Sequence, residues 1–307
     1  MSKTLVITAA TGKKSGGAFA DILGANPQTV NTLFPDGVRA IVRASSDTSR
    51  LERTIANVEM CIGALEDVVF LKRAFADADT VVHIAGIHWS RGIVAAAAAC
   101  GVRRLILVHT TGIYSRYKQA GEEYRQIDDY VYRTCKEHGI LLTILRPTMI
   151  YGNVMDNNVV TFIKMVDKLP IMPVVNGARY ELQPVHYRDL AKAYYAVLTH
   201  ETETANKDFD LSGGAPIELR EMLCVIGKEL GKKVHFVSCP FPIAYAGACA
   251  VYGVSLGKTD YREKVQRLCE PRVYSHAAAT QAFGYAPVDF AEGVKDEIQE
   301  YMNMKNR

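Results

Sequence analysis

The chain has 307 residues, of which 49% are hydrophobic and 22% are charged. This composition excludes disordered, collagen-like and low-complexity proteins, and the length allows one large domain or two ordinary ones. The 36 Lys and Arg residues and 33 Asp and Glu residues leave a net charge of +3, so neither nucleic acid nor a membrane is expected as a partner.

The sequence also predicts a cytoplasmic protein. The chain opens on a strand pattern and shows no signal peptide, and no apolar run approaches the roughly 20 residues of a membrane-spanning helix. Seven Cys residues form no CxxC pair, which is typical of a reducing compartment. The eight His residues show no HxxxH or HExxH spacing, so no metal site is predicted. Both a monomer and a homodimer fit the sequence.

Strands and helices alternate along the first half of the chain. Short apolar segments predict strands at residues 4–8, 38–43, 80–84, 105–108 and 140–145. Helical spacing predicts helices at 17–23, 68–76, 93–100 and 120–138. Strands that are apolar on both faces and alternate with helices form parallel sheets covered on both sides. The sequence therefore predicts an α/β fold with a doubly wound parallel sheet.

The pattern is looser after residue 152. It predicts helices at 189–198, capped by Asp189, and at 216–230, and strands at 209–211 and 234–237. Residues 243–252 are apolar nearly all round, which predicts a buried helix. Gly253–Gly257 has the GxSxG spacing of a hydrolase nucleophile elbow, but no strand pattern precedes it, so we interpret it as a helix end. The second half thus predicts a smaller α+β lobe.

A glycine-rich turn, TAATGKKSGG at residues 8–17, follows the first predicted strand. A strand, a glycine turn and a helix N-terminus form a phosphate site, because backbone N–H groups and the helix dipole face the anion. The turn lacks the first glycine of GxGxxG, and its Gly12–Gly16 spacing is one residue longer. Glycine turns also occur as plain structural punctuation, but the position after the first strand favours a nucleotide site.

Arg43 ends the second predicted strand and is followed by Ala44-Ser45-Ser46. An acidic residue at this place would bind the ribose diol of NAD, whereas a planar guanidinium suits the 2′-phosphate of NADP. We therefore predict NADP as the cofactor, with NAD as the alternative. A solvated strand-end arginine is the competing interpretation.

The order of several segments resembles the extended and atypical short-chain dehydrogenase/reductase superfamily, the NAD(P)-binding epimerase/dehydratase-like proteins. The segments are TAATGKKSGG, VRAIVR, GALEDVVFLKRAFADADTVVHIAG, GVRRLILVHTTGIYS, ILRPTMIYG, QPVHYRDLAKAY and AFGYAPVDFAEGVKDEI. The resemblance covers nearly the whole chain. It implies a Rossmann-type NAD(P)-binding domain at 1–152, to which 182–212 returns, and a substrate-binding lobe made of 153–181 and 213–307.

The resemblance also implies roles for individual residues. The pyrophosphate would lie on Thr11, Gly12, Lys13 and Gly16, and Arg43 would meet the adenosine end. Ala85 and Gly86 would pass beside the cofactor ribose, and the backbone from Pro147 to Ile150 would flank the nicotinamide. Thr110 matches the Ser or Thr that polarises the substrate oxygen. Tyr151 and His186 are expected on the substrate side.

Residues His88 and Trp89 follow the fourth predicted strand. Loops at this end of a parallel sheet border the cofactor crevice, so we predict that these two side chains contact the substrate. A packing role fits the same residues. Arg267 and Arg272 in the second lobe are candidate ligands of a substrate diphosphate, or ordinary surface arginines.

The catalytic Tyr–Lys pair of the family is ambiguous here. The family places a YxxxK pair on one helix face, where the lysine lowers the tyrosine pKa. Tyr114 and Lys118 have this spacing. Counting back from Pro147 instead favours Tyr117, with Gly121 where the lysine should be, and Tyr124 is a third candidate. The predicted catalytic residues are therefore Thr110, Tyr114, Tyr117 and Lys118.

Three functions fit these features. The first is an NADP(H)-dependent oxidoreductase acting on a small-molecule carbonyl or alcohol. The second is a sugar-nucleotide epimerase or dehydratase that retains its NAD. The third is a non-catalytic NADP-sensing or scaffold protein, which the loss of the Tyr–Lys pair would explain.

Overall fold

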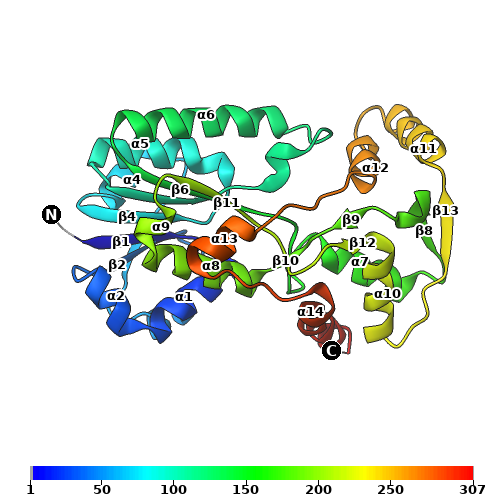
Figure 1. Cartoon of the computed structure of the whole chain (residues 1–307), viewed down its shortest axis with the longest axis horizontal. Helices are drawn as coiled ribbons and strands as arrows, with labels where there is room; N and C mark the ends of the chain where they lie inside the picture. The colour runs from blue at the N-terminus through cyan, green and yellow to red at the C-terminus, as the bar shows by residue number, and fades with distance from the viewer. Residues whose placement is uncertain (1–2, 307) are drawn as a thin grey trace.

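A seven-stranded parallel sheet forms the centre of the larger body in the computed structural model, which describes residues 3–306 (Figure 1). The strand order is β3-β2-β1-β4-β5-β6-β11, and every neighbouring pair is parallel. This confirms the predicted α/β fold class. The strands are β1 Thr4–Thr8, β2 Val38–Val42, β3 Glu59–Ile62, β4 Ala78–His83, β5 Arg104–Val108, β6 Leu141–Pro147 and β11 Lys207–Leu211.

Helices cover both faces of the sheet, as Figure 1 shows. One face packs on α4, α5 and α6 through one hydrophobic core, and the other on α1, α2, α8 and α13 through a second. The helices of this body are α1 Ser15–Ala25, α2 Pro27–Leu33, α3 Ser49–Thr54, α4 Val68–Ala74, α5 Ser90–Cys100, α6 Gly121–Glu137, α8 Tyr187–Thr199, α9 Glu201–Thr204 and α13 Ala277–Phe283, with 3₁₀ turns at Ile87–Trp89 and Thr111–Tyr114.

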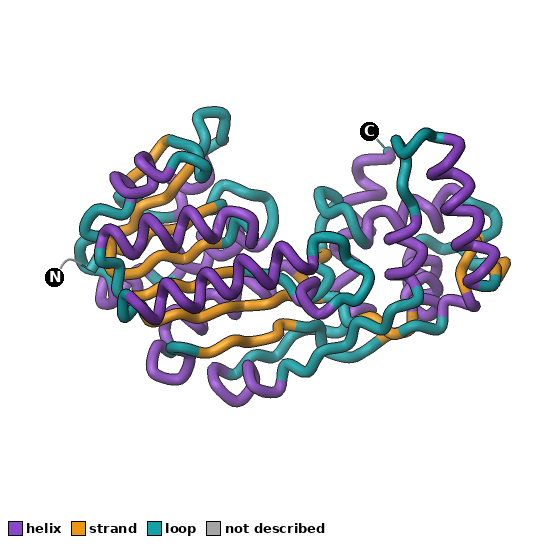
Figure 2. The backbone as a smooth tube through the Cα atoms, turned by 90° about the horizontal axis from the view of Figure 1, so that it is seen from above, coloured by secondary structure: helices purple, strands orange, loops and turns teal. Residues whose placement is uncertain are grey.

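The second body lies beside the carboxyl ends of the strands, and Figure 2 shows the two bodies side by side. Its core is formed mainly by α7, α10 and α14. Its elements are β7 Ile150–Tyr151, α7 Val159–Lys168, β8 Met172–Val175, β9 Glu181–Leu182, β10 Val185–His186, β12 Ile217–Glu218, α10 Leu219–Glu229, β13 Phe236–Cys239, α11 Phe241–Val254, α12 Arg262–Leu268 and α14 Phe290–Lys305, with a 3₁₀ turn at Asn176–Ala178.

The predicted assignment of residues 213–307 to the lobe differs from the structure in one segment. Helix α13 packs on the sheet body, where Ala279, Phe283 and the following Tyr285 are buried with β11 and α8. The Phe283 ring stands on Phe209 of β11 at a centroid distance of 5.2 Å. Helix α13 has only seven residues, so its sequence did not indicate which hydrophobic core its apolar face would pack against.

The N-terminus of α8 also differs from the prediction. The helix begins at Tyr187, and its cap is His186, whose Nδ1 accepts the Arg188 N–H at 3.3 Å. Asp189 lies inside the first turn and accepts the Val288 N–H at 2.9 Å. A buried carboxylate that holds a distant segment is indistinguishable in sequence from a helix cap.

Helix α11 forms where an apolar helix was predicted, but it is not buried. Ala248 is its one buried residue, and most of its other side chains face solvent. Within residues 3–306, no helix is both long enough and apolar enough to cross a bilayer. The segment Gly253–Gly257 is the end of this helix, as predicted for the GxSxG sequence.

A buried polar network ties α5, α6, β5 and β6 together. His109 at the end of β5 bonds to Ser90 through Nε2 at 2.9 Å and to Asp128 through Nδ1 at 2.7 Å. Arg146 of β6 forms an ion pair with the second oxygen of Asp128 at 2.7 Å. The order Ser–His–Asp resembles a hydrolase triad, but Ser90 is fully buried. The network therefore serves to hold the helices on the sheet.

A second buried contact joins the C-terminal helix to the loop after β7. Glu297 of α14 accepts the Gly152 N–H at 2.8 Å, and its carboxyl lies next to that of Asp156. Both carboxyls are buried. Burial and the neighbouring Asp156 raise the pKa of Glu297 to about 9, so Glu297 holds a proton at neutral pH.

The buried network around His109 and Arg146 predicts that two adjacent aspartates, Asp128 and Asp129, contribute very differently to the free energy of unfolding. We expect Asp128→Ala to lower the free energy of unfolding by about 3–5 kcal/mol, because it leaves a buried arginine short of its partner. The exposed Asp129 is the matched control, and Asp129→Ala should change stability by less than about 0.5 kcal/mol. Urea unfolding measures both. Equal effects at the two positions would show that the network does not hold the helices.

The carboxyl pair predicts how stability depends on pH. A pKa raised in the folded state stabilises the fold at low pH, and this stabilisation is lost as the pH rises from 4.5 towards about 9. The loss has a slope of at most about 1.4 kcal/mol per pH unit. Glu297→Gln should flatten the curve in urea titrations at several pH values, while Glu292→Gln on the same helix should keep it. An unchanged slope in Glu297→Gln would contradict the raised pKa of Glu297.

Candidate functional site

The glycine turn after β1 requires glycine for steric reasons. Ala9 takes a left-handed conformation with φ 59°, and its carbonyl accepts the Gly12 N–H at 3.1 Å. A Cβ on Gly16 would overlap the Ala9 carbonyl oxygen, and one on Gly17 would overlap the Gly12 carbonyl oxygen. The absence of both Cβ atoms lets α1 approach the end of the strand.

The N-terminus of α1 opens into a large cavity. Its cap, Lys14, makes no side-chain capping bond, and Ser15 and Gly16 line the cavity. Free N–H groups at a helix N-terminus are a site for a phosphate. The turn and the helix therefore fit the pyrophosphate of a dinucleotide.

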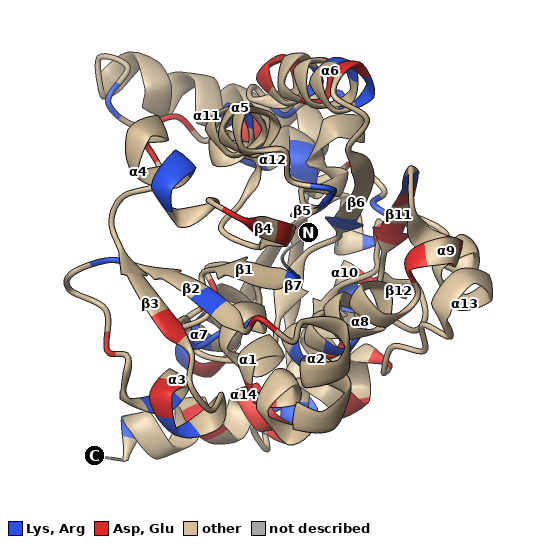
Figure 3. Ribbon diagram, turned by 90° about the vertical axis from the view of Figure 1, so that its left-hand side faces the viewer, with Lys and Arg blue, Asp and Glu red and all other residues tan. Residues whose placement is uncertain are grey.

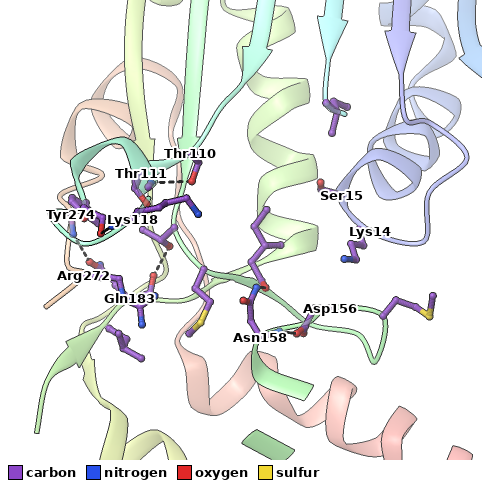
Figure 4. A pocket seen from close by; sticks show the side chains of 18 of the residues that line it. Lys14, Ser15, Thr110, Thr111, Lys118, Asp156, Asn158, Gln183, Arg272 and Tyr274 are labelled. Carbon is purple, nitrogen blue, oxygen red and sulfur yellow. Dashed lines mark hydrogen bonds between the residues drawn. The ribbon is translucent and has the colours of Figure 1, made fainter. Parts of the chain in front are cut away.

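The cavity has a volume of about 800 Å³ and reaches from this turn into the second lobe. Figure 4 shows Lys14 and Ser15 at one end and Thr110, Lys118, Arg272 and Tyr274 at the other. The described lining residues are Ala9, Gly12, Lys13, Lys14, Ser15, Gly16, Ile84, Thr110, Thr111, Gly112, Ser115, Lys118, Thr148, Met149, Ile150, Met155, Asp156, Asn158, Leu182, Gln183, Arg267, Arg272 and Tyr274.

A buried histidine positions the loop after β4. His83 Nε2 lies 3.0 Å from the Gly86 carbonyl oxygen, and Nδ1 lies 3.1 Å from Thr8 Oγ1. Burial lowers the pKa of His83 to about 4, so the ring is neutral, with Nε2 as donor and Nδ1 accepting the Thr8 hydroxyl proton. Thr8 in turn accepts the Ile84 N–H at 2.9 Å. The loop carrying Ala85 and Gly86 is thereby held beside the glycine turn.

Thr110 lies at the cavity surface just beyond β5. Its Oγ1 accepts the Gly112 N–H at 3.0 Å, which leaves the hydroxyl proton free for a ligand. The next residue, Thr111, donates to the Pro147 carbonyl oxygen at 3.2 Å and joins the loops after β5 and β6.

Lys118 lies in the loop before α6 and lines the cavity next to Thr110. A Cβ on Gly112 would lie 3.1 Å from Thr110 Oγ1 and 3.2 Å from Lys118 Cε, so the two side chains are neighbours above this glycine. Burial, and to a smaller extent Arg267, lower the pKa of Lys118. A lysine with a lowered pKa is a better proton donor near neutral pH.

The three candidate tyrosines do not line this cavity. Tyr114 donates its hydroxyl to Asp210 at 3.1 Å, and burial together with Asp210 raises the pKa of Tyr114 to about 12. It lies in a 3₁₀ turn and Lys118 in a loop, so the two do not share a helix face as a YxxxK pair would. Tyr117 is solvent-exposed, and Tyr124 is buried beneath Lys118.

The cavity has a strongly cationic end. Lys118, Arg267 and Arg272 all line it. Burial and then Arg267 lower the pKa of Arg272 to about 10. Among residues 3–306, Arg272 forms no ion pair with a carboxylate, and its Nε has no hydrogen-bond partner. Neighbouring positive charges that lower the pKa of Lys118 and of Arg272 favour an anionic ligand.

Tyr274, Gln183 and Asp156 are among the lining residues that were not found from the sequence. Tyr274 and Gln183 are joined by a hydrogen bond of 3.3 Å from the Tyr274 N–H to Gln183 Oε1, and Asp156 belongs to the pair with Glu297. They lie in loops of the lobe with no motif and no regular spacing, so their position depends on tertiary packing alone.

Four residues predicted to contact the substrate lie outside the cavity. Tyr151 and His186 are buried in the lobe, with ring centroids 5.3 Å apart, and the backbone of Gly293 closes over the Tyr151 hydroxyl. His88 points to solvent and lies 3.3 Å from Glu123, while Trp89 packs on the core beneath α5. Packing directs these four side chains away from the cavity, so their predicted contact with the substrate stays a prediction.

The predicted cofactor residues divide into two groups. Gly12, Lys13, Gly16 and Ile150 line the cavity, whereas Thr11, Ala85, Gly86 and Pro147 lie in the loops next to it. Arg43 is exposed just after β2, and among the described residues no carboxylate pairs with its guanidinium. In residues 3–306 there is no cluster of three side chains that could hold a metal ion.

Comparison with known proteins relates residues 28–169 to the NAD(P)H-binding family, whose model they match. A curated relative is NADH dehydrogenase (ubiquinone) 1 alpha subcomplex subunit 9, a mitochondrial protein of Arabidopsis thaliana. It is 28% identical over 106 residues, which are 34% of this chain and 26% of the relative. The match thus spans about a quarter of that protein's length.

Solved structures resemble the whole chain. They include a nucleoside-diphosphate-sugar epimerase of Pseudomonas aeruginosa, with a TM-score of 0.73, 14% identity and 98% of both chains covered. A dTDP-glucose 4,6-dehydratase of Streptomyces venezuelae, solved with NAD, has a TM-score of 0.71 and 16% identity, covering 99% of this chain and 98% of its own. A UDP-glucose 4-epimerase of Thermotoga maritima, solved with UDP-glucose, has a TM-score of 0.70 and 16% identity, covering 98% and 99%.

At these identities the solved structures establish the fold and leave the reaction open. The NAD(P)H-binding match begins after the glycine turn, covers β2 to β6 of the larger body and continues through α7 of the second. Residues 28–169 therefore match an NAD(P)H-binding family model, and the whole chain has the fold of these epimerase and dehydratase structures, as the resemblance implied.

Proposed function

We propose that this protein is an NADP(H)-dependent oxidoreductase that acts on a small anionic carbonyl compound or alcohol. One observation carries the proposal: a single cavity joins an uncapped helix N-terminus after a glycine turn to Thr110 and Lys118 beside two partly buried arginines. A dinucleotide and an anionic substrate can therefore meet in one enclosed space.

The proposed cofactor position follows the glycine turn. The N–H groups of Lys14, Ser15 and Gly16 would hold the pyrophosphate. The backbone at Ala85 and Gly86 would lie beside the ribose, and the loop from Pro147 to Ile150 would flank the nicotinamide. When bound, NADPH would supply a hydride to a carbonyl carbon.

The preference for NADP rests on charge at the adenosine end. Arg43 and Lys13 lie on the two loops that follow β2 and β1. Both cations are free to approach a 2′-phosphate, whereas NAD would leave them without an anionic partner.

The proposed proton chemistry uses Thr110 and Lys118. The Thr110 hydroxyl donates a hydrogen bond to the substrate oxygen, which polarises the carbonyl. As the carbon accepts the hydride, Lys118 Nζ transfers a proton to that oxygen, giving the alcohol, and the neutral amine regains a proton from solvent. The reverse direction uses the same groups with Lys118 as the base.

The substrate would carry a carboxylate or phosphate. Arg267 and Arg272 face the cavity from the lobe made of 153–181 and 213–307, and both have a buried Nε without a hydrogen-bond partner among the described residues. An anion at this end would satisfy these donors and offset the repulsion among the three cations. We propose this lobe as the substrate-binding part of the protein.

A second candidate is a non-catalytic NADP(H)-binding subunit of a larger assembly. The curated relative, by its name, is a subunit of NADH dehydrogenase, and Tyr114 lies with its hydroxyl on Asp210 instead of at the cavity.

The third candidate, an epimerase or dehydratase, shares the fold of the solved structures. It would retain nicotinamide through purification, which mass analysis of the denatured protein detects.

Arg43→Ala tests the NADP preference. We expect the mutation to weaken NADPH binding at least about tenfold, because a charge-assisted contact to the 2′-phosphate is lost, while NADH affinity stays within about twofold. Isothermal titration calorimetry measures both. Arg73→Ala on the far side of the sheet body is the control and should leave both affinities unchanged. Unaltered NADPH affinity in Arg43→Ala would show that Arg43 is a solvated side chain that does not contact the cofactor.

Lys118→Met and Tyr114→Phe separate the proposed proton donor from the literal motif. The assay follows NADPH oxidation with a panel of 2-oxo acids and phosphorylated ketones. We expect Lys118→Met to lower kcat/KM about a hundredfold or more, and Tyr114→Phe to change it by less than about threefold. Lys136→Met, an exposed lysine on α6, is the matched control.

Two outcomes would overturn this assignment. A large loss in Tyr114→Phe would restore the family's tyrosine as proton donor. Tight NADPH binding without oxidation of any compound in the panel would favour the non-catalytic subunit.

A further inference from the structure

Helix α11 presents an apolar face to solvent. It lies at the end of the second body, away from the sheet (Figure 1). Its fourteen residues include no charged side chain, and it is drawn entirely in the neutral colour of Figure 3. A surface helix of a soluble protein normally places polar residues outside, so this helix departs from the pattern.

The inward face of α11 is accounted for by its neighbours. Phe241, Tyr245, Ala248 and Tyr252 recur at helical spacing, with Ala248 buried and the Phe241 and Tyr245 rings stacked 5.6 Å apart. The Arg262 guanidinium of α12 lies 3.8 Å from the centroid of the Tyr252 ring. These contacts fix the helix on α12 and so determine which residues point outward.

The outward face carries Ile243, Gly247, Ala250 and Val254, also at helical spacing. All four are exposed, Ile243 by 63%. This stripe runs the length of the helix, roughly 20 Å at 1.5 Å per residue. Nothing in the described part of the chain covers it.

The tip beyond the helix extends the stripe. Val254 is 88% exposed and Leu256 is 87% exposed. Leu256 has φ 50° and Gly257 has φ 79°, a left-handed turn in which glycine or asparagine is the usual residue. A leucine here projects into solvent from a conformation that leucine rarely adopts.

The surrounding charge has one sign. From Lys232 to Thr259 the sequence contains no Asp or Glu, while Lys233 and Lys258 are exposed at the two ends of the segment. The Asp260 carboxylate that follows is paired with Arg262 at 2.7 Å. Lys258 therefore adjoins the exposed tip, whereas the nearby Asp260 and Glu263 are paired with Arg262 and Arg267. An apolar stripe that ends beside a cation complements a negatively charged surface with an apolar interior.

We propose that α11 and the tip at residues 254–258 dock on an anionic membrane surface, with Val254 and Leu256 inserted among the acyl chains and Lys258 among the headgroups. A short apolar helix with flanking lysines binds such an interface without crossing it. A second copy of the chain fits less well, because self-association would bring like charges together. This inference revises the expectation that no membrane is a partner, and it does not depend on the proposed reaction.

Vesicle sedimentation tests the proposal with the full chain. The probes are vesicles of phosphatidylcholine alone and vesicles with about 30% phosphatidylglycerol. We expect binding to the anionic vesicles that decreases as salt is raised. The double substitution Val254→Ser with Leu256→Ser should weaken it at least about tenfold, and Lys258→Gln severalfold. NADPH binding, measured in parallel, should be unchanged and thus verifies that each variant is folded.

The matched control removes two equally exposed apolar side chains from the other body. Ile62 is 64% and Val69 is 69% exposed, and Ile62→Ser with Val69→Ser should leave vesicle binding unchanged. Absence of wild-type binding to anionic vesicles would overturn the proposal. A wild-type dimer that the tip variant dissociates without vesicles would replace it with self-association. An equal loss in the control would show that the binding is non-specific.

Discussion

The parallel sheet imposes the constraint on which the rest of this structure depends. Because every strand runs in the same direction, the loops after β1, β4, β5 and β6 emerge at one edge. Strand β1 lies between β2 and β4, so the connections leave it in opposite directions and open a crevice there. The glycine turn, the Thr8–His83 contact, Thr110 and the Pro147 loop all meet at this edge.

Close approach of backbone atoms completes the site. Gly16 and Gly17 bring the first helix against the end of β1, and a neutral His83 holds the next loop in place. The first glycine of the usual GxGxxG fingerprint is absent, but Ala9 takes the left-handed conformation that this glycine would supply. The departure from GxGxxG is thus compatible with the same geometry.

The substrate end shows how a local motif can lose its usual meaning. Tyr114 and Lys118 have the spacing of a catalytic pair, but a 3₁₀ turn and a loop replace the helix that would align them. The tyrosine then lies on Asp210 of the edge strand, while the lysine turns to the cavity beside Thr110. The cationic wall from Arg267 and Arg272 comes from the other lobe, so the electrostatics of this end depend on how the two bodies meet.

The sequence alone determined six of the seven strands of the sheet, five of the helices that cover it and the glycine turn, because periodicity and turn chemistry are local properties. Strand β3 at Glu59–Ile62 was missed. Tertiary structure decided the directions of side chains that local pattern leaves open. Tyr151 and His186 entered the lobe core, Asp189 bound a distant backbone group, and α13 joined the sheet body. It also left α11 exposed, although its composition predicts burial. Apolar character shows that a helix needs a partner, but only the fold reveals whether the same chain supplies one.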